Sequence, residues 1–463
     1  MAPTVRSFSA EFEPLAGSAP PLIARFPEIY PGLLESNTYA GNQSAAGRFD
    51  ILPISTQECL RLGTDGRVEG PYAQAGGFLR SLAEWTRALR TPTSAVPLPF
   101  TGGWLLYLGY ELAMEVEPRL RLPLSPDGVV ALAIRAPAAW IRDRSRGQAW
   151  LVAEPGYEGL LDDFEAHVRE CGASGGDGGG GGGLGDLRVH EDDPQRFLSA
   201  VARALDYVAA GDIYQANLSR QWRVTSNRPL DPVSMYARLR SANPSPFAAL
   251  MRHGDFALMS SSPERLVSMR AGLVSTRPIA GTRPRGVSED TDAALRESLL
   301  NNDKERAEHV MLIDLERNDL GRVCVGGTVR VDEYMVLETY AHVHHIVSNV
   351  SGQLREDASP VDVIRALFPG GTITGVPKVR CMEIIGELEG TGRGAYTGSL
   401  GYLNRDGSCD LNILIRTLST QGEAMTFRAG AGIVADSVPM QELAETRAKA
   451  KGLLRALGAD EGQ

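Results

Sequence analysis

A run of glycines is the feature that most constrains how this chain can fold. Residues 172–183 read GASGGDGGGGGG, and glycine at this density holds neither a helix nor a strand. We expect a flexible surface loop over residues 172–185, between an N-terminal part (1–171) and a C-terminal part (186–463). Because linker composition indicates flexibility and not independence, we favour a loop inserted in one domain over a link between two domains.

The net charge and the cysteines narrow the class of protein. A formal net charge of −10 opposes binding to nucleic acid, because phosphate backbones repel a protein of this sign. No stretch reaches the ~20 apolar residues that span a bilayer, and the N-terminus lacks the pattern of a secretion signal. The five cysteines form no CxxC pair, which is typical of a reducing compartment. We therefore expect a cytoplasmic protein without nucleic-acid or membrane partners. The net charge does not exclude a small anionic molecule as the ligand.

A helix and a strand follow the glycine run. Asp193 before Pro194 predicts a capped helix start, and Gly211 predicts its end. Residues 213–224 then alternate in polarity, which predicts a strand with Tyr214 on its apolar face. The polar face of this strand is made by Gln215, Asn217 and Ser219. Such a face can line a site, although contact with solvent is the commoner reason for it.

Three apolar segments of the N-terminal part predict buried strands, at residues 102–112, 131–135 and 149–153. Strands and helices in this mixture predict sheets that carry helices, without the regular alternation of a doubly wound fold. No GxGxxG follows a strand and no GxxxxGK[ST] occurs. Dinucleotide-binding and P-loop folds therefore have no support.

The last helix of the chain is predicted over residues 439–457, with Ser437 as a candidate N-cap. Glu442, Glu445 and Lys449 recur at i, i+3 and i+7, which places them within a narrow arc of one face. An exposed ion pair between Glu445 and Lys449 explains this spacing without any function. The pattern alone does not decide between an exposed ion pair and a functional site.

A second acidic helix is predicted over residues 304–321, where Glu305 and Glu308 lie one turn apart on the same face. Two carboxylates from each of two helices suit a hard cation with oxygen ligands, typically magnesium that retains several waters. Salt-bridged surface glutamates explain the same spacing. The metal site is therefore weakly indicated by spacing alone.

Two glycine-rich turns could receive an anionic ligand, GAGIVADS (430–437) and PGGTITGVPK (369–378). Glycine lets backbone N–H groups approach a ligand carboxylate, and a helix start favours negative charge. Ordinary tight turns are an equally good explanation. Tyr396, Arg416 and His345 are single polar residues in predicted strands, and the HVHH spacing around His345 lacks the cysteines that would suggest zinc.

Eight segments follow one another between residues 193 and 457: GDIYQANLSR, NPSPF, SSPER, RPIAGTRPRG, AEHVMLIDLERNDLGRV, VHHIVS, PGGTITGVPK, and GAGIVADS with the final helix. Together they resemble the chorismate-utilising family, which contains anthranilate, aminodeoxychorismate, isochorismate and salicylate synthases. Such a set in this order is highly specific. The resemblance implies an α+β fold, a single large domain with two stacked antiparallel β-sheets and surrounding helices, to which both parts of the chain contribute strands.

The resemblance also implies how the two carboxylates of chorismate are bound. Glu308 and Glu445 look like the ligands of a magnesium ion that takes the ring carboxylate, and Glu305 and Glu442 look like supporting carboxylates. The enolpyruvyl carboxylate would be held by Tyr396, Arg416, Lys449 and the backbone around Gly430 and Gly432. A charged, bidentate arginine contact suits a carboxylate.

The resemblance gives three further residues a role at the ring. Glu264 of SSPER would protonate the departing C4 hydroxyl, and His345 and Thr372 would line the ring pocket. Where isochorismate- and salicylate-forming members have a lysine that activates water, this chain has Gln215. Because a neutral amide cannot deprotonate water near pH 7, the nitrogen-using branch is favoured. In that branch a glutaminase partner subunit is expected to deliver ammonia.

Ala280 bears on which ring carbon receives the nitrogen. Many aminodeoxychorismate synthases have a lysine there that attacks C2 of the ring, whereas anthranilate synthases typically have the PIAGT of this chain. Other segments resemble aminodeoxychorismate synthases instead, namely RFDIL (48–52), residues 102–118, PGG (369–371) and DLNILIRT (410–417). Giving these more weight, we expect the large subunit of an aminodeoxychorismate synthase, which serves 4-aminobenzoate and folate biosynthesis. Component I of an anthranilate synthase is the alternative.

LLES (33–36) together with NPSPF resembles the tryptophan pocket of both relatives, with candidate residues Leu34, Glu35, Ser36, Asn243, Pro244, Ser245, Pro246 and Phe247. A function of another class, a non-catalytic relative that senses chorismate or tryptophan, predicts the loss of metal or acid residues. The residues that would be lost are all present, namely Glu264, Glu308, Glu445 and Lys449. An enzyme is therefore the preferred reading.

Overall fold

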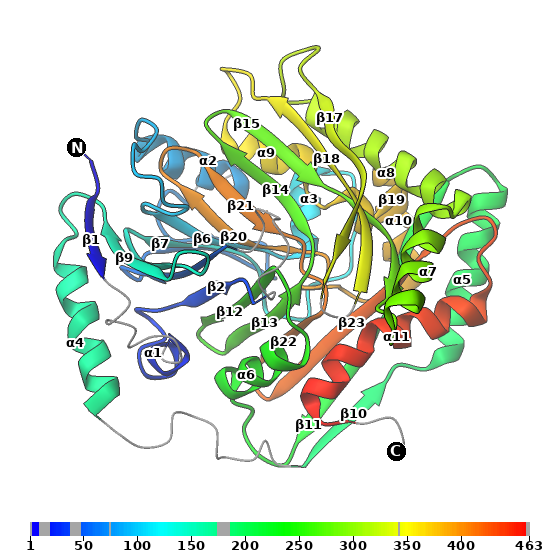
Figure 1. The fold of residues 1–463 in the computed structure, drawn as a ribbon, viewed down its shortest axis with the longest axis horizontal. Coiled ribbons are helices and arrows are strands. Elements are labelled where there is room, and N and C mark those ends of the chain that lie inside the picture. Colours follow the sequence, from blue (N-terminus) through cyan, green and yellow to red (C-terminus); the bar gives the residue numbers. More distant parts are fainter. Residues whose placement is uncertain are drawn as a thin grey trace.

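The apolar segments of the chain form the strands of two large antiparallel sheets, with helices around them (Figure 1). The computed structural model describes residues 2–8, 19–37, 48–73, 76–173, 186–340 and 343–459. The predicted glycine loop lies outside the described residues from Ser174 to Gly185, and its first two residues instead end helix α4 (Gly159–Ala173).

The first sheet has twelve strands among the described residues. Its order is β1 (Thr4–Phe8), β9 (Gln148–Ala153), β8 (Ala138–Asp143), β3 (Phe49–Ile54), β2 (Gly32–Glu35), β12 (Phe247–His253), β13 (Phe256–Ser262), β22 (Thr417–Gln421), β23 (Ala424–Ile433), β11 (Gln215–Ser226) and β10 (Leu187–Glu191), with β19 (Gly375–Val376) beside β11.

The second sheet has eleven strands in the same described ranges. Its order is β16 (Ile279–Pro284), β18 (Val343–Gln353), β15 (Leu273–Arg277), β14 (Arg265–Arg270), β21 (Cys409–Asn412), β20 (Ser399–Asn404), β6 (Gly103–Leu108), β7 (Val129–Ala136), β4 (Cys59–Gly63) and β5 (Val68–Glu69), with β17 (Arg330–Thr339) beside β18. In both sheets, strands from the two sides of the glycine run are neighbours. The predicted α+β fold with two antiparallel sheets is confirmed.

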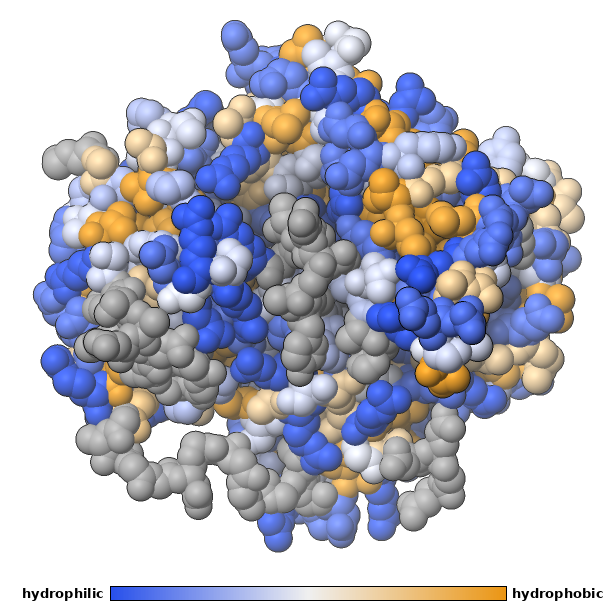
Figure 2. Space-filling view, viewed as in Figure 1, coloured by the Kyte–Doolittle hydropathy of each residue, from blue (hydrophilic) through white to orange (hydrophobic). Residues whose placement is uncertain are grey.

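The helices pack against the sheets from outside. They are α1 (Ala19–Arg25), α2 (Phe78–Ala88), α3 (Ala113–Val116), α4, α5 (Pro194–Ala209), α6 (Pro232–Ala242), α7 (Glu289–Leu300), α8 (Asp303–Gly321), α9 (Pro360–Leu367), α10 (Lys378–Glu389) and α11 (Pro439–Leu457), with single turns η2 (Tyr110–Leu112) and η3 (Gly371–Ile373). None of these described helices is long and apolar enough to cross a membrane. The face of the molecule in Figure 2 is mostly hydrophilic, with apolar side chains in small groups.

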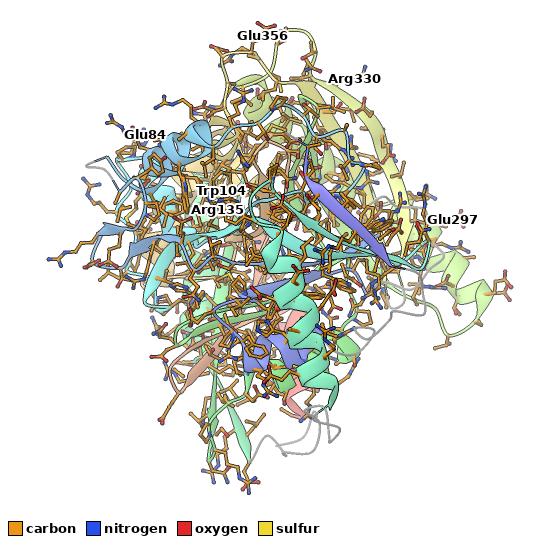
Figure 3. All side chains as sticks on the ribbon, turned by 90° about the vertical axis from the view of Figure 1, so that its left-hand side faces the viewer. Glu84, Trp104, Arg135, Glu297, Arg330 and Glu356 are labelled. Atoms are coloured by element: carbon orange, nitrogen blue, oxygen red, sulfur yellow. The ribbon has the colours of Figure 1, made fainter. Side chains whose placement is uncertain are left out.

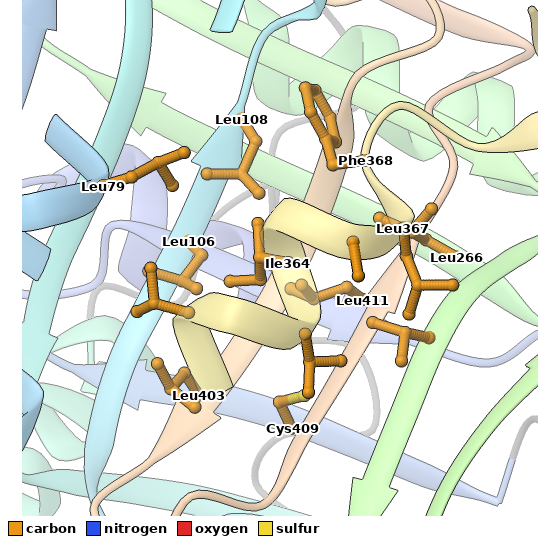
Figure 4. Packing of buried hydrophobic residues seen from close by; sticks show 14 of the residues in the cluster. Leu79, Leu106, Leu108, Leu266, Ile364, Leu367, Phe368, Leu403, Cys409 and Leu411 are labelled. Atoms are coloured by element: carbon orange, nitrogen blue, oxygen red, sulfur yellow. The ribbon is translucent and has the colours of Figure 1, made fainter. Parts of the chain in front are cut away.

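Strand β6 shows how the core is divided between the sheets and the helices. Its alternate residues face opposite sides, so Leu105 belongs to the cluster between the two sheets and Leu106 to the cluster under the helices. In that second cluster, side chains of α9 such as Ile364 and Leu367 pack on strands β6, β20 and β21 (Figure 4). Burying each such side chain stabilises the fold by about 1.5–3 kcal/mol.

The segment predicted as one strand over residues 102–112 is shorter in the structure. The strand ends at Leu108, and the chain continues as η2 and α3. The reason is that a short apolar run cannot be distinguished from a buried helical turn by its pattern. Tyr214 is a second correction, because it precedes β11 and is 71% exposed, not on an apolar face. The other two predicted N-terminal strands are confirmed as β7 and β9.

The predicted helix ends are confirmed in part. Asp193 caps α5 as predicted, accepting a hydrogen bond from the backbone of Gln195 at 2.9 Å. Ser437 does not cap α11, because its hydroxyl accepts from the backbone N–H of Val434 at 3.1 Å and closes the preceding turn. The helix still ends at Leu457 as predicted, before Gly458 in the left-handed conformation.

A buried arginine marks the interior of the N-terminal strands. Arg135 lies over the ring of Trp104, 5.3 Å from its centroid, and donates a hydrogen bond to Glu154. Figure 3 shows Trp104 and Arg135 together inside the molecule, whereas Glu84, Glu297, Arg330 and Glu356 lie at its periphery. Removing one partner from such a buried pair costs stability, because the other charge is left without compensation.

Candidate active site

Helices α8 and α11 carry the predicted metal-binding carboxylates. On α8, Glu308 accepts a hydrogen bond from Nε2 of Gln215 at 2.9 Å, which ties this helix to the start of β11. One turn earlier, Glu305 forms an ion pair with Arg283 at 2.6 Å, and its Oε2 is buried without a hydrogen-bond partner in the described chain. The two glutamates therefore face β11 and β16 and not open solvent.

On α11 the predicted ion pair is present and reaches the same region. Lys449 pairs with Glu445 at 2.7 Å, and both side chains are 47% exposed. The ammonium of Lys449 also donates to the backbone oxygen of Gly430 at 3.1 Å. The pair is thus a surface pair whose lysine connects α11 to strand β23. Glu442 lies half-buried one turn earlier on α11.

Gly430 and Gly432 leave room beside strand β23 for polar side chains. A Cβ atom on Gly430 would lie 2.5 Å from the Tyr396 hydroxyl and 2.7 Å from Oδ1 of Asn217. A Cβ atom on Gly432 would lie 2.5 Å from Nε2 of Gln215. Only glycine fits at either position, because real Cβ contacts are not this short. These glycines bring a tyrosine and two amides against one strand.

The polar face of β11 is buried, so contact with solvent does not explain it. Gln215, Asn217 and Ser219 are all under 10% exposed. The oxygen atoms Oε1 of Gln215 and Oδ1 of Asn217 have no hydrogen-bond partner among the described residues. Since buried polar atoms are normally satisfied, these two acceptors are free to meet a ligand. Asn217 was not among the predicted site residues, although its place on the polar face was the available signal.

Glu264 lies between β13 and β14 and has the properties of a proton donor. Burial raises the pKa of its carboxyl to about 7, although the Thr372 hydroxyl and the charges of Lys449 and Arg416 act to lower it. Thr372 donates to Oε1 of this carboxyl at 2.7 Å. A carboxyl with a pKa near neutrality is part protonated at the working pH, which suits a general acid.

Arg416 is half-buried and His345 is buried at the same site. Burial lowers the pKa of Arg416, and the nearby charge of Glu264 acts to raise it. Burial lowers the pKa of His345 to about 3, so its ring is neutral, and its Nδ1 shares a hydrogen bond with the Thr282 hydroxyl at 2.9 Å. Strand register places Ala280 opposite Ile346, the neighbour of His345. Ala280 itself is buried, at 7% exposure.

The carboxylates do not assemble a complete metal cluster by themselves. In the part of the chain that the structure describes, no group of three or more histidine, cysteine or acidic side chains could hold a metal ion. Magnesium, however, keeps several waters and needs only one or two carboxylates from the protein. The partnerless Oε2 of Glu305 and the neighbouring carboxylate of Glu308 supply oxygen donors of the right kind. The residues present fit such an ion without forming its whole shell.

A buried ion network beneath the glycines was missed by sequence reasoning. The carboxylate of Glu389 accepts hydrogen bonds from Arg393, from Arg428 and from both the backbone and hydroxyl of Ser219. Burial acts to raise the pKa of Glu389, but the two guanidinium groups prevail and lower it. Arg393 also donates to the backbone oxygen of Asn217 at 2.6 Å. The only sequence signal was an arginine three residues before Tyr396.

Half of the predicted tryptophan pocket lines a cavity between the two sheets. This cavity has a volume of about 330 Å³, and its walls include Leu34, Glu35, Pro246 and Phe247. The other candidates lie next to it without lining it, namely Ser36, Asn243, Pro244 and Ser245. Ser245, for example, donates its backbone N–H to Asn37 at 2.7 Å. A cavity of this size falls in the range of small-molecule sites.

Comparison with known proteins relates most of the chain to one family. A family model described as "chorismate binding enzyme" matches residues 55–455. The chain is 38% identical to aminodeoxychorismate synthase component 1 of Bacillus subtilis over 471 residues, covering 98% of this chain and 95% of that protein. It is 48% identical to anthranilate synthase component 1 of Synechocystis over 416 residues, covering 83% and 82%.

A solved structure agrees with the observed fold. The crystal structure of anthranilate synthase component I from Streptococcus pneumoniae superposes with a TM-score of 0.79 and 29% sequence identity. The match covers 96% of this chain and 98% of that one. The residues that meet around Gly430 and Glu264 therefore lie in a fold that is shared almost end to end.

Proposed function

The chain belongs to the chorismate-binding enzyme family, and from this we propose that it is the large subunit of an aminodeoxychorismate synthase. It would be a cytoplasmic enzyme that replaces the C4 hydroxyl of chorismate with an amino group. The observation that carries the proposal is the buried amide of Gln215 beside Glu308. A glutaminase partner would supply the ammonia.

The side chain of Gln215 favours ammonia over water as the nucleophile. Its Nε2 donates to Glu308, and its Oε1 is a free acceptor in a site that excludes solvent. An amide has no basic group that could take a proton from water near pH 7. Ammonia needs no such base, because its lone pair is already nucleophilic, and a free acceptor can orient one of its N–H bonds.

The carboxyl of Glu264 would protonate the leaving oxygen at C4. The hydrogen bond from Thr372 to Oε1 favours a proton on the other oxygen, Oε2. In the proposed step the ammonia nitrogen forms a bond to C4 as the C4–O bond breaks, and the Glu264 proton leaves with that oxygen as water. Direct substitution is proposed because Ala280 presents only a methyl group, so the covalent route through a lysine has no nucleophile.

The enolpyruvyl carboxylate would lie over the two glycines of β23. Tyr396, Lys449 and Arg416 surround this place, and burial raises the pKa of Tyr396 to about 12, so its hydroxyl stays a donor. His345 is neutral and would pack on the ring with Thr372. Two cationic side chains and a neutral donor match one carboxylate in charge and hydrogen bonding.

Magnesium is the proposed cofactor, with Glu308 and Glu445 as ligands and Glu305 and Glu442 in support. When bound, the ion would supply positive charge for the ring carboxylate of chorismate. In the structure Glu308 accepts from the amide of Gln215, whereas Glu305 pairs with Arg283 and Glu445 with Lys449. A bound divalent ion would compete with these partners for the carboxylate oxygens.

The position of amination is the finer part of the proposal. The B. subtilis aminodeoxychorismate synthase component 1 matches along nearly the whole chain, which supports amination at C4. Two observations favour a second candidate, component I of an anthranilate synthase: Ala280, and the higher identity to the Synechocystis enzyme. The two candidates share the site and differ in the product.

Product analysis separates the two candidates. The protein is incubated with chorismate, magnesium and an ammonium salt, and the products are resolved by chromatography with and without an aminodeoxychorismate lyase. We expect 4-aminobenzoate only when the lyase is present. Anthranilate formed without any added enzyme would overturn the first candidate in favour of the second. No consumption of chorismate would overturn both.

We also propose that the cavity between the sheets binds tryptophan. The support is its apolar wall at Leu34 and Phe247 and the acidic Glu35, whose carboxylate accepts from the Tyr236 hydroxyl at 2.7 Å. Calorimetric titration should detect binding to the parent protein and a loss of at least tenfold in affinity for Phe247→Ala. Equal affinity in both proteins would place tryptophan elsewhere.

A further inference from the structure

The loop that carries Tyr396 has an unusual backbone. It spans residues 393–397, between α10 and β20, and two of its residues take the left-handed conformation: Gly394 with φ +58° and Thr397 with φ +64°. A threonine at this angle is strained, so the surrounding structure must hold the loop in place. What holds it therefore determines where Tyr396 points.

Two buried carboxyl groups hold this loop through its backbone. Glu111 accepts hydrogen bonds from the N–H groups of Arg393 at 2.7 Å and of Gly394 at 3.2 Å. Asp127 accepts from the N–H of Ala395 at 2.6 Å. Three successive backbone N–H groups form a concavity for an anion, and here the chain fills that concavity with its own carboxyl groups.

Both carboxyl groups come from the N-terminal part of the chain and lie in the interior. Burial raises the pKa of Glu111 to about 7, and that of Asp127 to about 6. Neither forms an ion pair in the described part of the chain, and Asp127 also accepts from the Ser419 hydroxyl at 2.9 Å. Burying carboxyl groups without ion-pair partners is costly, so what they contribute is the geometry of the loop.

Displacing the loop would displace the Tyr396 hydroxyl. The N–H of Tyr396 donates to Arg393 within the loop at 3.1 Å, and the Arg393 guanidinium lies 5.4 Å from the Tyr396 ring. At its other end the hydroxyl is in close approach to Gly430. The loop also packs closely on the carboxyl group that holds it, because a Cβ atom on Gly394 would collide with Asp127.

We propose that Glu111 and Asp127 are positioning residues for the binding of the enolpyruvyl carboxylate. They fix loop 393–397 so that the Tyr396 hydroxyl stays at Gly430, and neither touches the substrate. This rests on the proposed role of Tyr396 in chorismate binding. Through these two residues the N-terminal part acts on a site whose recognisable motifs are all in the C-terminal part.

Glu111→Gln and Asp127→Asn test the proposal by the steady-state consumption of chorismate, whichever product forms. Each amide places an N–H₂ group among backbone donors and so disrupts the concavity. We expect KM for chorismate to rise at least tenfold, with kcat within threefold of the parent. Glu154→Gln is the matched control, because Glu154 is equally buried but pairs with Arg135. It should lower the melting temperature without changing KM.

A double-mutant cycle with Tyr396→Phe shows whether the effect passes through the tyrosine. Once the hydroxyl is absent, adding Glu111→Gln should change KM by less than twofold. A full tenfold effect in that background would overturn the proposal, as would an unchanged KM in Glu111→Gln alone. If Tyr396→Phe itself leaves chorismate consumption unchanged, it is the role of Tyr396 that fails. Should Glu111→Gln not fold, the cycle is run with Asp127→Asn and read in the same way.

Discussion

The protonation of Glu264 sets the first expectation at the scale of a single residue. Because burial raises the pKa of this carboxyl to about 7, the acid form is lost as the pH rises above that value. At a constant concentration of free ammonia, kcat should fall about tenfold per pH unit above pH 7. Glu264→Gln should lower kcat by about 10²-fold or more and remove this dependence. A flat profile in the parent enzyme would exclude Glu264 as the proton donor.

The same carboxyl links stability to pH. Its pKa is higher in the folded protein (about 7) than the ordinary 4.5, so the stabilisation is complete below pH 4.5 and is lost as the pH rises through 7. Glu264→Gln removes the cost of a buried charge. We expect the variant to gain up to about 3 kcal/mol at pH 8 relative to the parent, and little at pH 4.5. Urea unfolding at the two pH values measures this difference.

The acidic residues of the two helices are tested by removing one charge at a time. Glu308→Gln and Glu445→Gln keep the size of the side chain, and each should lower activity by several orders of magnitude while the circular dichroism spectrum stays unchanged. Magnesium titration should show weaker activation in both variants. Near-normal turnover of Glu308→Gln at low magnesium would contradict the metal assignment. Glu383→Gln serves as the control, because Glu383 is a partly exposed residue of α10 whose partners are Arg119 and Arg380.

Ala280 allows a test of the direct substitution. In Ala280→Lys the new amine must lose its proton, so burial has to lower its pKa from ~10.4 before it can attack the ring. The position is 7% exposed and lies opposite Ile346, so a longer side chain is crowded. We expect slower turnover than in the parent and no adduct by intact-protein mass spectrometry. A chorismate adduct on the parent protein would reveal an unrecognised nucleophile.

At the scale of the element, the glycines of β23 give the most direct test of the site. In Gly432→Ala the new methyl would collide with the amide of Gln215, which lies against the strand. We expect kcat/KM to fall at least 100-fold with the fold intact, because the backbone of Gly432 is not left-handed. Gly159→Ala is the control, since a methyl there meets nothing within 4 Å and begins helix α4. It should be neutral in activity.

The helices show what a local pattern can predict and what it cannot. The end of α11 at Leu457 and the arc of Glu445 and Lys449 follow from spacing, because helical geometry is periodic. The start of α11 does not, because the hydroxyl of Ser437 closes the turn at Val434 and does not cap the helix. In the same way, the polar face of β11 was predicted, but its burial depends on distant groups that cover it, such as Glu308 over Gln215 and Glu389 over Ser219.

At the scale of the whole molecule, the two sides of the glycine run form one structural unit. Strand β2 pairs with β12, and β6 pairs with β20, so each sheet is completed by both parts. Residues 186–463 expressed alone should therefore be insoluble or inactive, although they hold all eight ordered segments of the family resemblance. Co-expression with residues 1–173 should restore chorismate consumption. An active C-terminal fragment would contradict both the interleaved sheets and the role given to Glu111.

The contacts of Glu111 and Asp127 could not have been predicted from the sequence. Each meets loop 393–397 across more than 260 residues of chain, and no periodicity or motif links positions so far apart. Tyr396 and Arg416 could be named because they lie in the part of the chain, residues 193–457, that resembles the family. Their supports are set by tertiary packing, which brings an apolar N-terminal segment against a loop of the C-terminal part.

Because each sheet combines strands from both parts of the chain, neither sheet can be completed early during synthesis on the ribosome. Strand β2 ends at Glu35, and its partner β12 begins only at Phe247. At the usual 5–20 residues per second, about 10–40 s pass before that partner is made. During this time the N-terminal strands emerge from the ribosome with unpaired edges, whose free N–H and C=O groups can pair with other nascent chains. A holdase that binds early-emerging strands should therefore raise the yield of active enzyme more than one that acts after release.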